Sequence, residues 1–467
     1  MARRETPLIY QQLEITAIAS EGMGIARHNG MVVFVEQTLT GDVVDVRITR
    51  KKSGFRQGIP VHFHQYSSLR IEPVCTHFGV CGGCKWQNLS YADQLAHKAR
   101  QVYDALHRLV KIELPDFNPI LGAPEPYHYR NKLEYTFSDS RWLTAQEIKS
   151  ETSFEHRNAL GFHIPGKFDK VLDISHCHLQ PEPGNAIRLF VRNYAIEQQL
   201  PFFNLVKQTG WLRTLTLRNT LAGEWMFCLS VTEQNKELFK LLDAVAAAFP
   251  QITSLLYAVN NKRNDTLEGV EVMTYKGQPY ITELMEDLRF RIGPKSFYQT
   301  NPRQAYELYK VVREFADIRS NHNVYDLYTG TGTIALFVAR QAAKVTGVEY
   351  VEDAVHDARI NAQANNISNA NFFAGDMKNI LVPEFFAQHG KPDVIITDPP
   401  RAGMHEEVCQ RIAGAGAQRI VYVSCNPATQ ARDLGLLDAH YKVTKVQPVD
   451  MFPQTTHVEN VVLLVKK

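Results

Sequence analysis

The sequence predicts an α/β protein whose last part is a doubly wound, mostly parallel sheet, preceded by a small β-barrel and a mixed, mostly β central region. Three observations predict this class. From Asn301 onward, strand-like and helix-like segments alternate, and a Gly-x-Gly turn at 330–332 follows the first of these strands. Such alternation builds a parallel sheet with helices on both faces. In the first 68 residues, short β-rich segments are separated by glycine turns, which is typical of a small barrel.

Length and composition bound the possibilities. The chain has 467 residues, enough for about three domains, and we divide it into 1–68, 69–295 and 296–467. No apolar run approaches the roughly 20 residues that span a bilayer, and the basic N-terminus lacks the apolar core of a signal peptide. We therefore expect a cytoplasmic protein with no membrane partner. Its seven cysteines are then expected to be reduced or bound to metal.

The N-terminal module is expected to form strands at 13–18, 31–35 and 42–48, as in barrels of the oligonucleotide-binding kind. A basic stretch follows at residues 46–71. It contains no acidic residue, and its cationic residues are Arg47, Arg50, Lys51, Lys52, Arg56 and Arg70. On a barrel surface such a stretch favours nucleic-acid binding, whereas a solvated charged loop is the alternative.

The central region begins with clustered cysteines at 69–88 and a helix at about 90–110, which we expect to pack on the last domain. Residues 118–295 are expected to be mostly β, with one helix near 235–248. In the last domain we expect helices at 304–316, 351–365 and 406–413, and strands at 323–328, 343–350, 370–374, 393–397 and 419–424. Two further strands, 442–449 and 457–465, follow without an intervening helix, so one of them should run antiparallel.

The glycine turn has the features of a nucleotide-cofactor site. Gly330 and Gly332 let the backbone approach a ligand, and the following helix begins near Thr333. Glu349 ends the second strand, where it would accept ribose hydroxyls, and Asp376 follows the third, where it would hold an amino group. The alternative is that these residues are turn formers and helix caps. The arrangement resembles the S-adenosylmethionine-dependent methyltransferase fold, which implies that cofactor.

Reacting residues are expected at the next strand ends. Asp398-Pro399-Pro400-Arg401 ends the fourth strand, and Ser424-Cys425-Asn426-Pro427 ends the fifth. The first motif lacks the aromatic residue of amino-nitrogen methylation loops and the Pro-Cys of RNA cytosine-C5 methylation. A Cys425 thiolate that adds to uracil C6 would make C5 nucleophilic, and a general base must then remove the C5 proton. Glu459 starts the last strand and should lie on the same rim. The alternatives are an inert buried thiol and a surface acid.

Together these motifs resemble the RNA uracil-C5 methyltransferase family. The resemblance implies that Cys425 is the nucleophile and Glu459 the base. It also implies a cofactor and uracil pocket formed by Gln299, Tyr328, Thr333, Glu349, Asp376 and Asp398, together with the glycines of the turn. Tyr328 and Thr333 differ from the more usual Phe and Asn. The N-terminal module resembles the TRAM domain of RNA-modifying enzymes.

A second cysteine cluster follows the pattern Cys75-x5-Cys81-x2-Cys84, and Cys177 lies further along the chain. Four thiolates fit a zinc ion or an iron–sulfur cluster, and spacing alone does not choose between them. Radical S-adenosylmethionine enzymes usually have Cys-x3-Cys-x2-Cys instead. The family resemblance implies a [4Fe-4S] cluster, which ribosomal-RNA members carry, whereas tRNA-type members lack both the cluster and the TRAM domain. Cys228 and Cys409 are interpreted as core residues.

The sequence therefore predicts an enzyme that forms 5-methyluridine in 23S ribosomal RNA, with no obligate protein partner. A tRNA uracil-C5 methyltransferase is the second possibility, and the extra domains argue against it. A different class is an RNA-binding, cluster-containing protein with a vestigial methylation site. Cofactor turnover would separate that class from an enzyme, whereas salt-dependent RNA binding would not.

Overall fold

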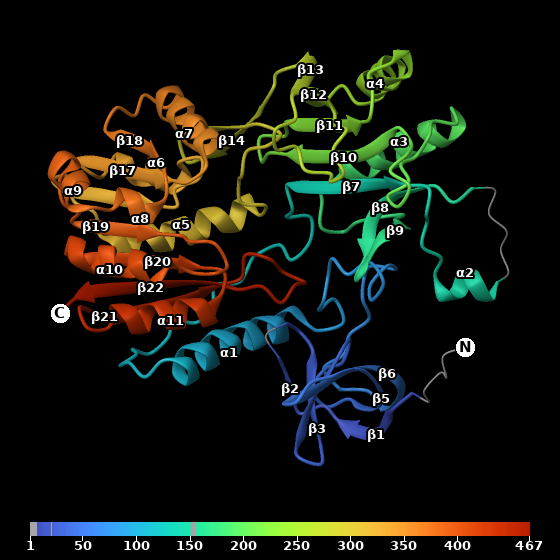
Figure 1. Cartoon of the computed structure of the whole chain (residues 1–467), viewed down its shortest axis with the longest axis horizontal. Coiled ribbons are helices and arrows are strands. Elements are labelled where there is room, and N and C mark those ends of the chain that lie inside the picture. The colour runs from blue at the N-terminus through green and yellow to red at the C-terminus, as the bar shows by residue number, and fades with distance from the viewer. Residues whose placement is uncertain (1–6, 20, 151–155) are drawn as a thin grey trace.

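A computed structural model of the chain describes residues 7–19, 21–150 and 156–467, and its parts are arranged around a common centre (Figure 1). The first sheet lies at the bottom of the view, the central sheet at the upper right, and the C-terminal sheet with its helices at the left. No helix in these described ranges is long and apolar enough to cross a membrane.

The first sheet has the strand order β1-β5-β6-β4-β3-β2. Its strands are β1 (Ile9–Glu14), β2 (Ala17–Ile18), β3 (Gly24–His28), β4 (Met31–Val35), β5 (Val43–Lys51) and β6 (Phe55–Gln65). Alternate residues such as Val33, Val35, Val44 and Val46 are fully buried, as a half-buried sheet requires. β6 was not predicted: its Pro60 and its alternating histidines gave no strand pattern, yet it pairs along most of β5.

The central sheet has the order β13-β12-β11-β10-β7-β8-β9. Its strands are β7 (Lys132–Ser138), β8 (Ala159–Ile164), β9 (Lys167–Asp173), β10 (Leu212–Asn219), β11 (Trp225–Val231), β12 (Ile252–Val259) and β13 (Val272–Gly277). The expectation of a single helix here was wrong, because α2 (Ala145–Lys149) and α3 (Gly184–Glu197) accompany α4 (Lys236–Ala248). α3 begins after Pro183 without a side-chain cap, so it lacked a start signal, but it buries Ile187, Val191 and Ala195.

A hairpin of β14 (Ile281–Met285) and β15 (Leu288–Ile292) leads into the C-terminal sheet, which has the order β18-β17-β16-β19-β20-β22-β21. The predicted strands are confirmed as β16 (Asn323–Leu327), β17 (Lys344–Glu349), β18 (Ala370–Ala374), β19 (Val394–Thr397), β20 (Arg419–Ser424), β21 (Tyr441–Val449) and β22 (Glu459–Lys466). β22 runs antiparallel to both of its neighbours, as expected for the closing pair.

Helices cover both faces of this sheet (Figure 1). One apolar core holds residues of α5 (Pro302–Ala316), α6 (Thr333–Ala339) and α7 (Glu352–Ala364). The core on the other face holds residues of α1 (Tyr91–Leu109), α8 (Met377–Ile380), α10 (Glu406–Ala415) and α11 (Pro427–Leu437), and α9 (Pro383–His389) borders it. α1 packs on α11, so a helix from the central region completes this core. The helices α8, α9 and α11 were not predicted; α11 contains Gly435, which weakens its helical pattern.

Candidate active site

The turn that carries Cys425 joins β20 to α11. Asn426 is the N-cap of α11, and its side chain accepts a hydrogen bond from Ala428 N at 3.2 Å. Ser424 Oγ accepts from Asn426 N at 3.1 Å, so both residues beside Cys425 fix the backbone. Because Pro427 is pre-organised for the first helical turn, the strand must end here. Cys425 is thereby held half-buried at the carboxyl end of β20.

The loop after β19 lies directly against this turn. Asn426 Nδ2 and Thr429 Oγ1 donate to the carbonyl oxygen of Arg401 at 3.0 and 3.2 Å. The Arg401 guanidinium in turn donates to Nδ1 of His457 at 2.9 Å. Arg401 therefore connects the Cys425 turn with the segment that leads into β22.

Glu459 is the first residue of β22, and the antiparallel register pairs the next residue, Asn460, with Ser424. This places the start of β22 beside the end of β20, and Glu459 is only 6% exposed. Burial and the neighbouring Asp398 carboxylate both raise the pKa of Glu459, and burial raises the pKa of Asp398. The pair therefore has a higher proton affinity than exposed carboxylates.

The Cys425 thiol belongs to the same electrostatic environment. Burial raises the pKa of Cys425 to about 11, the charges of Glu459 and Asp398 add to the shift, and Arg401 opposes it. The structure thus brings together Cys425, Glu459 and Asp398, which the sequence placed at three separate strand ends. A thiol, a basic carboxylate and a cation at one edge of the sheet are the groups that nucleophilic addition and proton removal require.

The glycine turn lies at the carboxyl end of β16. Gly330 and Gly332 have φ of 55° and 79°, and a Cβ on Gly332 would lie 2.9 Å from Ala358 Cβ. Glu349 Oε2 accepts from Gly330 N at 3.0 Å, so the acid at the end of β17 already contacts the turn. Beneath it, buried Asp326 accepts from Thr329 Oγ1 at 2.5 Å and from Ala335 N at 3.0 Å. The turn therefore has a fixed shape.

The other predicted pocket residues surround this turn. Tyr328 has a left-handed backbone, with φ of 62°, and Thr333 is buried at the start of α6. Asp376 accepts from Lys378 N at 2.9 Å and caps α8, which is the alternative role that the sequence left open. Gln299 belongs to a loop tied to the central region, because Asn131 Nδ2 donates to its carbonyl oxygen at 3.2 Å.

Tyr309 was not predicted as a site residue. It lies on α5, it is almost fully buried, and its pKa is raised first by burial and then by the charges of Asp398, Asp326 and Glu459. A side-chain hydrogen bond with Gln299 opposes this shift. Its place in the apolar stripe of a helix gave no signal, since core aromatics have the same spacing.

Comparisons with known proteins follow the same division of the chain. The model of the tRNA (uracil-5-)-methyltransferase family matches residues 277–467, and the TRAM domain model matches residues 10–61. An uncharacterized RNA methyltransferase of Bacteroides thetaiotaomicron is 56% identical over 96% of this chain and 99% of its own length. This chain belongs to the RNA uracil-C5 methyltransferase family. A second relative, from Porphyromonas gingivalis, is 54% identical over 97% of this chain and 99% of its own length.

A solved member of this methyltransferase family has the same architecture. The tRNA (uracil-54, C5)-methyltransferase of Pyrococcus abyssi, in complex with S-adenosyl-L-homocysteine, is 27% identical, with a TM-score of 0.75. The match covers 97% of this chain and 99% of the Pyrococcus chain. The argument that the extra domains speak against a tRNA enzyme was therefore wrong, because a tRNA methyltransferase matches nearly the whole chain. The protein is an RNA uracil-5 methyltransferase, and its fold supports S-adenosylmethionine as methyl donor.

The cysteine-rich loop of this methyltransferase packs against the segment after β9. His77 Nε2 accepts from Ser175 N at 2.9 Å, and Cys177 N donates to Asn185 Oδ1 at 2.7 Å. Burial raises the pKa of Cys81 to about 11 and that of Cys84 to about 12. Cys75 and Cys177 add to both shifts, so the four predicted thiols lie near one another.

Backbone N–H groups also face these sulfurs, for example those of His77 and Phe78 at Cys75 and that of Leu179 at Cys177. Four thiols with N–H donors fit the chemistry of a metal–thiolate group. Their side chains do not form a closed ligand shell, because no three His, Cys, Asp or Glu of the described chain are arranged to hold a metal ion. The expected cluster therefore stays a prediction.

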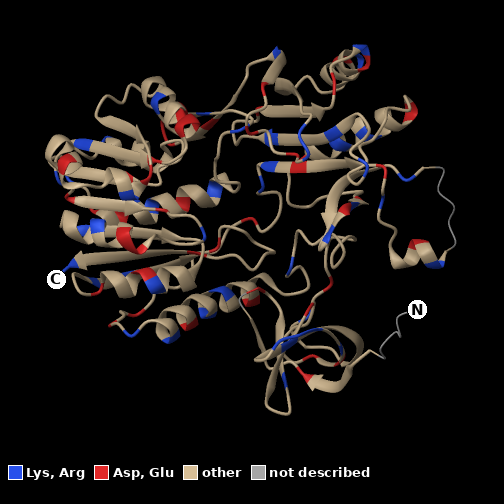
Figure 2. Ribbon diagram, in the orientation of Figure 1, with Lys and Arg blue, Asp and Glu red and all other residues tan. Residues whose placement is uncertain are grey.

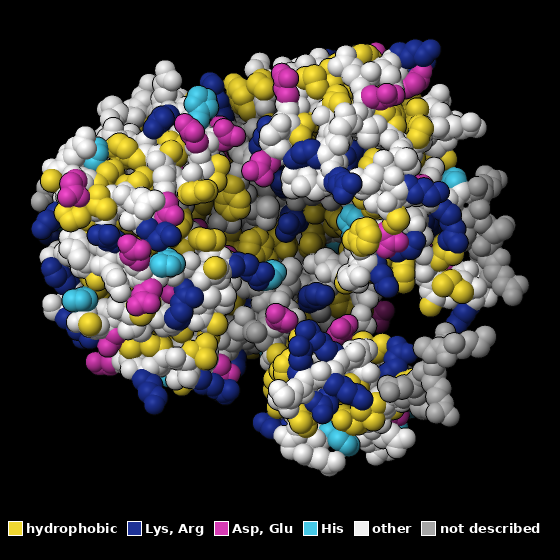
Figure 3. Space-filling model, viewed as in Figure 1, with side chains coloured by type: hydrophobic (Ala, Val, Ile, Leu, Met, Phe, Trp, Pro, Cys, Tyr) yellow, Lys and Arg dark blue, Asp and Glu magenta, His cyan; other side chains and the backbone are white. Residues whose placement is uncertain are grey.

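The basic surface of the TRAM domain differs from the predicted one in two residues, Arg56 and Arg70. Arg56 is half-buried, and its guanidinium donates to the carbonyl oxygen of Phe55 at 3.1 Å. Arg70 is paired with buried Asp42 through two hydrogen bonds of 2.9 and 2.5 Å, so its charge is compensated. The side chains that remain exposed are Arg47, Arg50, Lys51 and Lys52. Lys and Arg lie along β5 and β6 in the ribbon view and gather on the visible face of the domain in the space-filling view (Figures 2 and 3).

Proposed function

We propose that the enzyme methylates C5 of a uridine in RNA, with Cys425 as nucleophile and Glu459 as general base. The observation that carries this proposal is the register of β20 and β22, which puts the start of one strand beside the end of the other. The raised pKa of Glu459 supports its role, because a carboxylate of high proton affinity is the better base.

In the proposed reaction the Cys425 thiolate adds to uracil C6, and the electron pair of the C5–C6 bond moves to C5 and the O4 enolate. When bound, S-adenosylmethionine would supply the methyl group to C5 and would leave as S-adenosylhomocysteine. Glu459 then removes the C5 proton, the C6–S bond breaks, and the thiolate is restored. The target base must leave its stack to reach the half-buried thiol. The Arg401 guanidinium favours the thiolate, since it lowers the pKa of Cys425.

The remaining pocket residues are assigned by their positions. Glu349 is proposed to bind the ribose hydroxyls and Asp376 the adenine amino group, while Gly330, Gly332, Tyr328 and Thr333 shape the cofactor turn. Gln299 and Asp398 are proposed to hold the uracil. Support comes from the cluster of raised pKa values at Asp398, Tyr309 and Glu459, since strongly perturbed groups gather at functional sites.

For the substrate we propose 23S ribosomal RNA, with tRNA as the second candidate. The ribosomal proposal rests on the cysteine pattern, whereas the likeness to the Pyrococcus tRNA enzyme favours tRNA. Residues 1–68 and 69–295 would hold the flanking RNA, and 296–467 would carry the chemistry. We further propose that Cys75, Cys81, Cys84 and Cys177 bind a [4Fe-4S] cluster. The proximity of the four thiols supports this proposal. Zinc is the alternative, because it also binds four cysteine thiolates.

A covalent-trapping experiment tests the function and the substrate together. Anaerobically purified enzyme is mixed with S-adenosylmethionine and 5-fluorouridine-substituted 23S fragments or tRNA, then run on a denaturing gel. Fluorine cannot leave as a proton does, so the adduct should persist with wild-type enzyme and be absent with Cys425→Ala. Cys409→Ala, a buried thiol on α10, is the matched control and should trap RNA normally. An adduct with tRNA alone would refute the ribosomal substrate, and no adduct with either RNA would refute the mechanism.

A further inference from the structure

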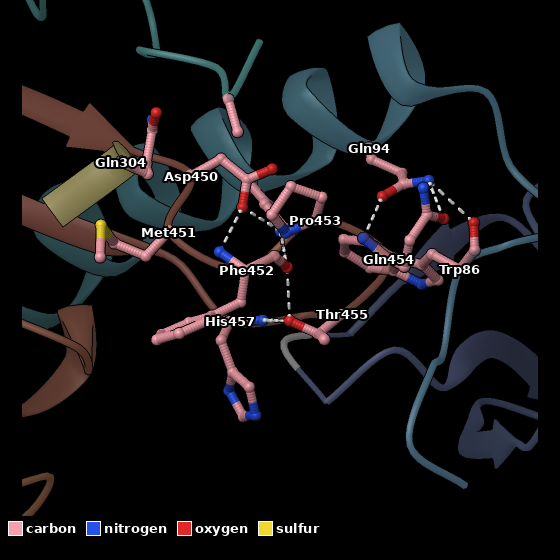
Figure 4. Close-up of polar contacts among 12 residues, drawn as sticks. Trp86, Gln94, Gln304, Asp450, Met451, Phe452, Pro453, Gln454, Thr455 and His457 are labelled. Carbon is pink, nitrogen blue, oxygen red and sulfur yellow. Dashed lines mark hydrogen bonds and ion pairs between the residues drawn. The ribbon is translucent and has the colours of Figure 1, made fainter. Parts of the chain in front are cut away.

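The segment between β21 and β22, residues 450–458, leads directly into Glu459. Within this loop, Met451 and Pro453 to Thr456 are buried, although no helix or strand includes them. Figure 4 shows that polar side chains from other elements surround it. Because an irregular segment has no ladder of backbone hydrogen bonds, its conformation depends on these outside contacts.

The first outside contact is a buried ion pair with α1. Lys98 Nζ lies 2.6 Å from Asp450 Oδ1, and both side chains are fully buried. The same ammonium donates to the carbonyl oxygen of Phe452 at 3.0 Å, and Tyr91 Oη donates to Asp450 Oδ2 at 2.9 Å. Desolvation makes a buried ion pair a poor source of stability, so its geometric role is the more informative one.

The second contact is a pair of glutamines. Gln94 Nε2 donates to Gln454 Oε1 at 3.0 Å, and Gln454 N donates to Gln94 Oε1 at 2.9 Å (Figure 4). The carbonyl oxygen of Gln454 accepts from Lys85 N and Trp86 N at 2.8 and 3.2 Å. Since Lys85 follows Cys84, the cysteine-rich loop is bonded to the same point of the 450–458 loop.

A relay of hydrogen bonds runs from these contacts toward Glu459. Asp450 Oδ1 accepts from Phe452 N at 3.0 Å, and the Phe452 carbonyl accepts from Thr455 Oγ1 at 2.7 Å. Thr455 Oγ1 then accepts from His457 N at 3.2 Å (Figure 4). His457 is two residues before Glu459 and accepts the hydrogen bond of Arg401.

We infer that Lys98, Asp450, Gln94 and Gln454 are positioning residues for the general base. Together they fix the 450–458 loop so that Glu459 faces C5 of the bound uracil. Lys98 and Gln94 act on the loop from α1, outside the C-terminal domain, and Asp450 and Gln454 are their partners within the loop. The inference rests on the proposed function. Displacing a catalytic group by about 1 Å costs up to about 100-fold in rate, so the effect should be confined to the step that Glu459 performs.

The test separates that step from the one performed by Cys425. Lys98→Met combined with Asp450→Asn removes both charges and keeps both shapes. Proton removal is measured as tritium release from [5-³H]uridine-labelled RNA, and nucleophilic addition as adduct formation with 5-fluorouridine RNA. We expect tritium release to fall by about tenfold or more, while adduct formation stays within about threefold of wild type. Methylated covalent adduct should also accumulate on ordinary RNA.

The matched control is Arg213→Met combined with Asp265→Asn, an ion pair of 2.8 Å with a buried arginine in the central sheet. It should leave the ratio of the two rates unchanged, because a general loss of folded enzyme lowers both together. Gln454→Asn serves if the double variant does not fold: asparagine tolerates the left-handed backbone at φ 66° but withdraws Oε1 from Gln94. It should shift the ratio in the same direction.

Equal losses in both rates, or an unchanged ratio in both variants, would overturn the positioning role. Absence of any adduct with the wild-type enzyme would instead refute the proposed function itself.

Discussion

Replacing Glu459 by glutamine should separate the two halves of the reaction. General bases contribute about 10²- to 10⁴-fold to a rate, or about 3 to 5 kcal/mol. Glu459 is only 6% exposed, so bulk water has little access to the site and cannot readily take over as base. Asp398 shares the pocket and can act as a weak substitute, which places the expected loss of tritium release nearer 10²- to 10³-fold.

Nucleophilic addition should not suffer in this variant. The Glu459 charge raises the pKa of Cys425, so replacing Glu459 by a neutral side chain does not disfavour the thiolate. The variant should therefore form the adduct at least as fast as wild type and accumulate it on ordinary RNA. Glu283→Gln is the matched control, because Glu283 is also a fully buried acid whose pKa is raised by burial. Tritium release at the wild-type rate, or parallel loss of both steps, would refute the assignment of the base.

Four further outcomes are expected. Because folding raises the pKa of Glu459, the folded protein should lose stability as the pH rises above about 5. Over that rise in pH, the thermal midpoint of the Glu459→Gln variant should fall less than that of the wild type. Glu349→Gln should weaken S-adenosylmethionine binding about tenfold in calorimetry, since a hydrogen bond to a charged acceptor is worth about 1.5–3 kcal/mol; unchanged affinity would contradict its ribose contact. Arg401→Ala should move the pH profile of adduct formation upward, because its charge lowers the pKa of Cys425; an unshifted profile would argue against that role. Anaerobic enzyme should contain about four iron atoms per chain and lose them in Cys75→Ser, whereas one zinc would exclude the cluster.

The sequence predicted the C-terminal sheet well because most of its strands are buried on both faces and form apolar runs between clear turns. Strands 370–374 and 419–424 were placed without error, and the last strand runs antiparallel as expected. Local signals failed where tertiary contacts decide the structure. α3 has no side-chain cap, and α11 contains Gly435, yet both are stabilised by the apolar faces they bury.

The site was predictable only where chemistry demands a residue type at a strand end. Cys425, Glu459 and Asp398 were proposed in this way, and the structure brings them together, since a parallel sheet gathers strand ends at one rim. Tyr309 and Lys98 have no such signal in the sequence. Tyr309 lies in the apolar stripe of a helix, and Lys98 resembles any helical lysine. The partner of Lys98 is 352 residues away in the chain, so only the fold reveals that both charges are buried.

Burial at this site affects the proposed nucleophile and the proposed base in opposite ways. It makes Glu459 a stronger base, but it also raises the pKa of Cys425 to about 11, so that the attacking thiolate is scarce at neutral pH. Arg401 acts on both groups, because its charge lowers the pKa of the thiol and of Glu459. Its carbonyl oxygen accepts a hydrogen bond from the Cys425 turn, and its guanidinium donates one to His457. Arg401 is thus held by hydrogen bonds both to the turn after β20, which carries Cys425, and to the segment before β22, which begins with Glu459. A conservative Arg401→Lys change keeps the charge but loses the rigid fork, so it should preserve the pH profile better than the rate.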